Sequence, residues 1–170
     1  MNFRSLFPLL FSITIFITGC QKKDPSGNPC DGLMNEAPPT KIMVKFVEKG
    51  TGQNLILSKN IKTSDITVVN INTGKPFDNW AIMSNGSSAS PFYGMLQFSV
   101  FHETAGQYPY QIKLGDLGTA TLAYTVSKTA TGNACKPEAF PVSGIKIADH
   151  SFTQFTFNGE TFPNILVLEL

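Results

Sequence analysis

The sequence predicts an all-β fold, a two-sheet antiparallel sandwich of eight or nine strands. Short segments rich in β-branched and aromatic residues recur about every 8–14 residues, and glycine, proline and asparagine separate them. No segment carries an apolar stripe with the 3.6-residue period of a helix over three turns. A sandwich is favoured over a barrel because the segments are short and show no pore or ligand-barrel pattern. We expect an Ig-like or transthyretin-like topology.

The candidate strands begin at Lys41. Residues 41–48 alternate polar and apolar side chains, which places Ile42, Val44 and Phe46 on one face. A turn with two glycines, residues 49–53, joins this segment to residues 54–57 in a predicted hairpin. Residues 127–141 are expected to form a loop. The later candidate strands are residues 65–72, 77–84, 92–101, 110–114, 120–126, 142–148 and 154–159, and the sequence ends in a run of branched aliphatic residues, 164–170.

The N-terminal residues predict an export signal. Arg4 is the only charge in residues 1–19, and residues 6–17 are almost wholly apolar. An apolar run of about a dozen residues is shorter than the roughly 20 residues of a membrane-spanning helix, but it is typical of a secretory signal peptide. The alternative, a buried helix of the domain, is disfavoured by Pro8 and by the β-branched residues of segment 13–17.

Three regions therefore divide the chain. Residues 1–19 are the predicted signal peptide. Residues 20–39 form a predicted linker, because four prolines and two glycines make them a poor helix or strand. Residues 40–170 form the predicted β-sandwich domain, a size that suits a single hydrophobic core.

The end of the signal segment gives Cys20 a particular meaning. Residues 17–20 read Ile-Thr-Gly-Cys, which resembles the lipobox of bacterial lipoproteins. The resemblance implies that the Cys20 thiol receives a diacylglyceryl group and that Cys20 becomes the first residue of the mature chain. Two or three acyl chains would hold a protein firmly on a membrane, whereas one chain gives only marginal binding. The alternative is a free or disulfide-bonded cysteine after ordinary cleavage.

The residues after Cys20 refine the expected location. Gln21 is not Asp, so the inner-membrane retention signal of enterobacterial lipoproteins is missing, which implies the outer membrane. Residues 20–24 also resemble the export signals of surface-exposed lipoproteins of the Bacteroidota, and the whole chain resembles their small β-sandwich lipoproteins. The periplasmic and cell-surface faces both remain open.

The charge balance excludes one class of partner. Removal of residues 1–19 leaves 12 basic and 12 acidic residues, so the mature chain is near neutral. A nucleic-acid-binding protein would need a basic face, and we expect no nucleic-acid partner.

Two cysteines remain in the predicted mature chain, Cys30 and Cys135. In an oxidising envelope an even pair most simply forms a disulfide, and two free thiols are the main alternative. The chain has no Cys-x-x-Cys motif, and His102 and His150 show no ligand spacing, so we expect no metal site and no cofactor.

The sequence contains no recognisable catalytic motif, and we expect no catalytic residues and no enzyme activity. There is no Gly-x-Ser-x-Gly motif, and the pair His102–Glu103 lacks the second histidine of a zinc protease motif. Trp80 is a possible ligand-binding platform, although a lone tryptophan in a sandwich more often packs between the sheets.

One segment resembles a feature of Ig-like bacterial modules. Residues 104–116 resemble their Gly-x-Tyr strand entry, in which a tyrosine hydroxyl bonds to a backbone group at a sheet corner. Tyr108 is the first candidate for this tyrosine and Tyr110 the second. Pro109 departs from the usual pattern, because proline fits poorly inside a central strand.

Three functions are open at this point. The first is a non-enzymatic, lipid-anchored envelope protein that binds or scaffolds another envelope component. The second is a carbohydrate- or ligand-binding accessory module of an outer-membrane uptake system, which would need an exposed aromatic platform. The third is a hydrolase, which would need polar side chains that converge in a cleft.

Overall fold

The computed structural model describes residue 30 and residues 38–170. The chain divides into two units, residues 1–34 and residues 35–170, and all described residues except Cys30 belong to the second unit. The predicted signal peptide 1–19, Cys20 and linker residues 21–29 and 31–37 lie outside the described residues.

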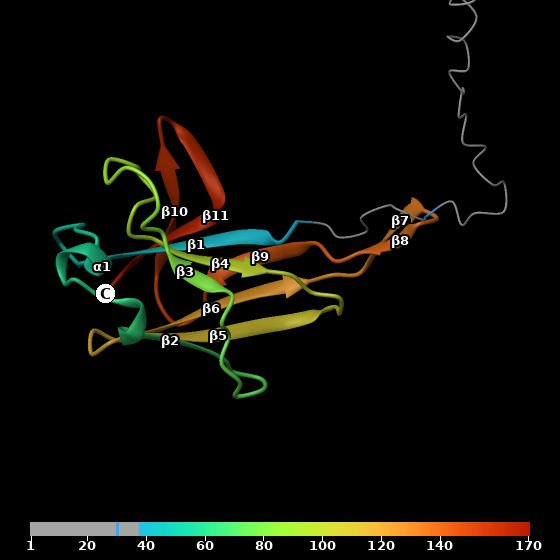
Figure 1. The fold of residues 1–170 in the computed structure, drawn as a ribbon, viewed down its shortest axis with the longest axis horizontal. Helices are drawn as coiled ribbons and strands as arrows, with labels where there is room; N and C mark the ends of the chain where they lie inside the picture. Colours follow the sequence, from blue (N-terminus) through green and yellow to red (C-terminus); the bar gives the residue numbers. More distant parts are fainter. Residues whose placement is uncertain (1–29, 31–37) are drawn as a thin grey trace, which may run out of the picture. The chain divides into compact units, whose positions relative to one another are not determined.

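The second unit is a β-sandwich, which confirms the predicted fold class (Figure 1). Its first sheet has the strand order β10-β11-β1-β4-β3, and its second sheet has the order β2-β5-β6-β9. A separate two-stranded hairpin, β7-β8, extends from one end of the sandwich (Figure 1). The bounds are β1 (Thr40–Val47), β2 (Ile66–Asn70), β3 (Trp80–Ile82), β4 (Leu96–Val100), β5 (Gly106–Leu114), β6 (Thr119–Val126), β7 (Thr129–Asn133), β8 (Lys136–Ala139), β9 (Val142–Ile147), β10 (Phe152–Phe157) and β11 (Glu160–Glu169).

The core follows from two-residue periodicity. Ile42, Val44 and Phe46 of β1 are buried on one face, as the sequence predicts, while the residues between them are more exposed. Every second residue of β4 and β6 is buried in the same way. Because successive side chains of a strand point to opposite faces, these inward rows from both sheets form one main hydrophobic cluster.

One strand pair departs from the antiparallel prediction. β1 and β11 run parallel, with Met43 opposite Ile165 and Val47 opposite Glu169. The last strand of the domain lies beside the first, between β1 and β10. All other pairs within the sheets are antiparallel.

Residues 54–57 were predicted as a strand, and this prediction is wrong. Residues 55–57 belong to a short helix, α1 (Leu55–Ser58), and the side chain of its N-cap residue, Asn54, accepts a hydrogen bond from the Leu57 backbone N–H. Asn54 itself forms an isolated antiparallel bridge with Val47. Leu55 and Ile56 are both buried although they are adjacent. Adjacent buried residues do not fit a half-buried strand, and an N-cap asparagine favours a helix start.

In the described part of the chain, the two sheets of the sandwich hold nine strands, within the predicted eight or nine, and the separate hairpin adds two more. The described residues contain eleven strands, and the predicted loop 127–141 holds two of them, β7 and β8. The five residues of β7 are all exposed, so this hairpin has no buried face to produce an apolar pattern in the sequence.

Pro109 lies inside β5, opposite Ala123 of β6. The backbone N–H and C=O of a strand residue point to the same side, and the Pro109 carbonyl accepts a hydrogen bond from the Ile71 N–H at 2.9 Å. The missing N–H therefore faces the β2 side. Since β2 ends at Asn70, opposite Tyr110, the proline breaks no bond of that ladder.

Candidate binding pocket

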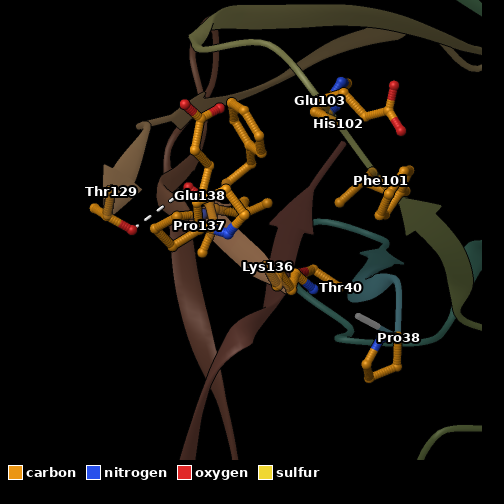
Figure 2. A pocket seen from close by; sticks show the side chains of 14 residues that line it. Pro38, Thr40, Phe101, His102, Glu103, Thr129, Lys136, Pro137 and Glu138 are labelled. Atoms are coloured by element: carbon orange, nitrogen blue, oxygen red, sulfur yellow. Dashed lines mark hydrogen bonds between the residues drawn. The ribbon is translucent and has the colours of Figure 1, made fainter. Parts of the chain in front are cut away.

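A pocket of about 640 Å³ lies where the strands of both sheets end, next to the β7-β8 hairpin. We call it the end pocket. Figure 2 shows Phe101 and Glu103 on one side of it and Pro137 and Glu138 on the other. The lining comes from Pro38 and Thr40, residues 100–103, Thr129, and residues 136–142.

The end pocket offers an apolar surface to solvent. Phe101 follows the last residue of β4 and is 51% exposed. Phe140 and Val142 are half-buried and pack against the main core, to which buried Val100 belongs. A pocket with mostly apolar walls and a few polar groups is the usual form of a ligand site.

Charged groups stand at the rim of the end pocket. Glu138 forms an exposed ion pair with Lys128, with 2.6 Å between the carboxylate and the ammonium group. Glu103 and Lys136 contribute one further charge of each sign. The rim can therefore offer both hydrogen-bond acceptors and a cation to a bound molecule.

His102 connects the end pocket to the core. Its Nε2 lies 2.8 Å from the hydroxyl oxygen of buried Tyr124, and its ring lies 3.7 Å from the ring of Tyr108, measured between centroids. Burial lowers the pKa of His102, and burial, with smaller contributions from Tyr110 and Tyr108, raises the pKa of Tyr124. Both groups are therefore neutral near pH 7, joined by one hydrogen bond.

The lowered pKa of His102 predicts a stability change with pH. The unfolded chain binds a proton near the ordinary histidine pKa of 6.5, and the folded chain binds it only at lower pH. His102 therefore contributes its full stabilisation above pH 6.5. As the pH drops below 6.5 toward the pKa of His102 in the folded chain, we expect the free energy of unfolding to fall.

Denaturation midpoints above and below pH 6.5 test this expectation. His102→Gln should reduce the loss of stability on acidification. An equal loss in wild type and His102→Gln would contradict the assignment.

Tyr108 occupies the predicted corner position. Its hydroxyl donates to the backbone carbonyl of Thr104 at 2.8 Å and lies 2.8 Å from the Thr104 hydroxyl. The second candidate, Tyr110, is instead buried in the main core against Phe77, with 4.7 Å between ring centroids. The bond to a backbone group four residues earlier confirms Tyr108 and fixes the turn between β4 and β5.

We expect Tyr108→Phe to lower the free energy of unfolding by about 1 kcal/mol, because it removes the hydroxyl and leaves the ring in place. Urea denaturation measures the change. Tyr93→Phe is the matched control, since the Tyr93 hydroxyl makes no hydrogen bond to another described residue, and it should change the value little. Equal effects of the two variants would show that the corner bond contributes nothing.

Trp80 lies on the edge strand β3, opposite Phe98 of β4. Its side chain is half-buried and packs against the main core. Trp80 is not among the residues that line the end pocket. The exposed aromatic side chain at the pocket is Phe101, which the sequence pattern places at the end of a predicted strand without marking it as functional.

Cys30 and Cys135 are disulfide-bonded, as predicted. Cys135 lies in the turn between β7 and β8, where its N–H donates to the Asn133 side chain at 2.9 Å. The turn that carries the disulfide thus belongs to the hairpin beside the end pocket.

Asp149 and His150 form a structural contact. The Asp149 carboxylate accepts hydrogen bonds from the backbone N–H and the hydroxyl of Thr121, both at 2.8 Å, and lies 2.9 Å from His150 Nδ1. Burial raises the pKa of Asp149, but the hydrogen bonds from His150 and Thr121 outweigh it and lower the pKa overall. The carboxylate ties the end of β9 to β6.

Within the described part of the chain, no group of three or more His, Cys, Asp or Glu side chains could hold a metal ion. In the same residues, no helix has the length and apolar character needed to cross a membrane. No protein-family model matches the chain, and no curated protein or solved structure is significantly similar to it.

Proposed function

We propose that the protein is a lipid-anchored, non-enzymatic protein of the bacterial outer membrane that binds another envelope component through the end pocket. The anchor rests on the resemblance of residues 17–20 to a lipobox and on the signal-like residues before it. The binding role rests on one structural observation: Phe101 is 51% exposed at the mouth of an apolar pocket. Exposure of large apolar side chains in a concave site marks an interaction surface.

The position of the pocket suits a tethered binder. Pro38 lines the pocket and Thr40 begins β1, so the chain that joins the domain to its predicted anchor enters the sandwich at this pocket. A partner bound here would contact the domain beside its tether.

Site-specific photocross-linking in the native envelope tests the binding role. A photoreactive residue at position 101 should give a light-dependent adduct of defined mass. The same residue at Leu117, which is 39% exposed in the turn between β5 and β6, is the control and should not give this adduct. No adduct at position 101, or identical adducts at both positions, would contradict the proposal.

A carbohydrate ligand is the second candidate. Phe101 supplies an apolar face to which a sugar ring could pack, and the carboxylates of Glu103 and Glu138 supply acceptors for its hydroxyl groups. Calorimetric titration with a panel of envelope glycans tests this candidate. Binding by the wild type that Phe101→Ala abolishes would support it, and no heat with any glycan would remove it.

A further inference from the structure

The β7-β8 hairpin forms one wall of the end pocket, and its own contacts hold that wall weakly. Thr129 of β7 and all four residues of β8 line the pocket, across from Phe101 and Glu103 (Figure 2). Among the described residues, every hydrogen bond and ion pair of residues 128–139 joins two members of that segment. None of these residues belongs to either hydrophobic cluster. An isolated two-stranded hairpin is at best marginally stable in water.

Apart from its base, the hairpin has one further attachment in the described part of the chain, the disulfide between Cys30 and Cys135. At the base, the Ser127 N–H donates to the Pro141 carbonyl at 3.2 Å, whereas Cys135 lies in the turn at the opposite end. Eight peptide units lead from Cys30 to Pro38, which lines the pocket, and they span at most about 28 Å. The disulfide therefore ties the tip of the hairpin to the chain that enters β1, and it limits how far the wall can swing from the pocket.

The disulfide is accessible to thiol reagents. Cys30 and Cys135 are both partly exposed, and residues 131–134, just before Cys135, are exposed. Exposed disulfides exchange with thiols more readily than bonds buried in a core. A dithiol opens such a bond through a mixed disulfide: both cysteines become thiols and the dithiol becomes a disulfide, a transfer of two electrons and two protons. Exchange with a disulfide oxidant closes the bond by the reverse reaction.

We propose that the Cys30–Cys135 disulfide is a redox switch of the end pocket, an inference that rests on the proposed binding role of this pocket. With the bond closed, the hairpin is held as a wall and the pocket is complete. With the bond open, the hairpin separates from the wall that carries Phe101, and a ligand loses the contacts that Pro137 and Glu138 supply. The protein thus acquires its binding form when the bond closes in an oxidising compartment.

Hydrogen–deuterium exchange measured by mass spectrometry tests the switch without a ligand. The full chain in detergent is labelled before and after reduction with dithiothreitol, in a pulse too short for β1, β4 and β6 of the oxidised chain to take up deuterium. Residues 128–139 should be protected in the oxidised chain and should lose this protection on reduction, while β1, β4 and β6 stay protected. A hairpin that is unprotected when oxidised or protected when reduced would overturn the proposal. Equal loss of protection in the hairpin and in β1, β4 and β6 would also overturn it.

The double variant Cys30→Ser with Cys135→Ser separates the effect of the bond from other effects of the reductant. Its hairpin should exchange like that of the reduced wild type, because neither chain has the second attachment. Dithiothreitol should change nothing further in the double variant. Hairpin protection equal to that of the oxidised wild type would overturn the proposal.

Photocross-linking from position 101 connects the switch to binding. The adduct expected from the proposed function should form in the wild-type background and should be lost in the double-serine background. No adduct in either background would contradict the binding role itself. An equal yield of adduct in both backgrounds would uphold the binding role and overturn the switch.

Discussion

Phe98→Ala is expected to lower the free energy of unfolding by about 3–5 kcal/mol, the usual cost of removing a buried phenylalanine side chain. Phe98 is 1% exposed in β4, and β4 lies between β1 and β3 in the first sheet. Its ring stacks on Phe77, with 6.3 Å between centroids, and its backbone neighbours are Ile42 and Trp80. Truncation would leave a cavity that rigid strands on both sides cannot close.

Urea denaturation followed by circular dichroism measures this effect. The matched control is Phe101→Ala, the same substitution three residues later at a position that is 51% exposed. Phe101→Ala should lower the free energy of unfolding much less than Phe98→Ala does. The Phe101 side chain is already largely exposed to solvent in the folded state, so its removal loses little buried apolar area. Comparable losses at the two positions would contradict the assignment of Phe98 to the core and of Phe101 to the surface.

Removal of the disulfide is expected to give the second large effect. Cys30 and Cys135 are about 105 positions apart, and a ring of that size restricts the unfolded chain by up to about 4–5 kcal/mol in the loop-entropy model. The double variant Cys30→Ser with Cys135→Ser should therefore unfold at a clearly lower denaturant concentration. The double replacement avoids a new unpaired thiol.

The wild type with and without a reducing agent provides the comparison. Reduction should lower the stability of the wild type to that of the double variant and should leave the double variant unchanged. If reduction leaves the wild-type midpoint unchanged, the bond does not constrain the unfolded state.

The sequence predicts most of the fold because the core obeys local periodicity. β1, β4 and β6 each bury alternate residues, and a two-residue pattern is visible without knowledge of the partner strand. The parallel pairing of β1 with β11 was not predictable in this way, since it depends on the order in which distant strands assemble. α1 was missed because four residues are too few to show a helical period, and Asn54 was the only local signal.

The candidate site was harder to predict than the fold. Tyr108 and the two disulfide cysteines carry local or compositional signals, and the sequence identified them. The end pocket unites segments separated by about a hundred positions, from Pro38 to Val142. Nothing near Phe101 in the sequence shows that β4 ends there and leaves the ring exposed. Trp80 drew attention by residue type, although its place opposite Phe98 gives it a packing contact with the core.

The intact mass of the protein purified from its native membrane tests the proposed lipid anchor most directly. In the proposed function, the attachment of the domain to the membrane depends on Cys20. The account predicts a mature chain that begins at Cys20 and whose mass exceeds that of residues 20–170 by a diacylglyceryl group, with or without an acyl chain on the new amino group. A chain that begins elsewhere, or one that carries Cys20 as an unmodified thiol, would contradict it.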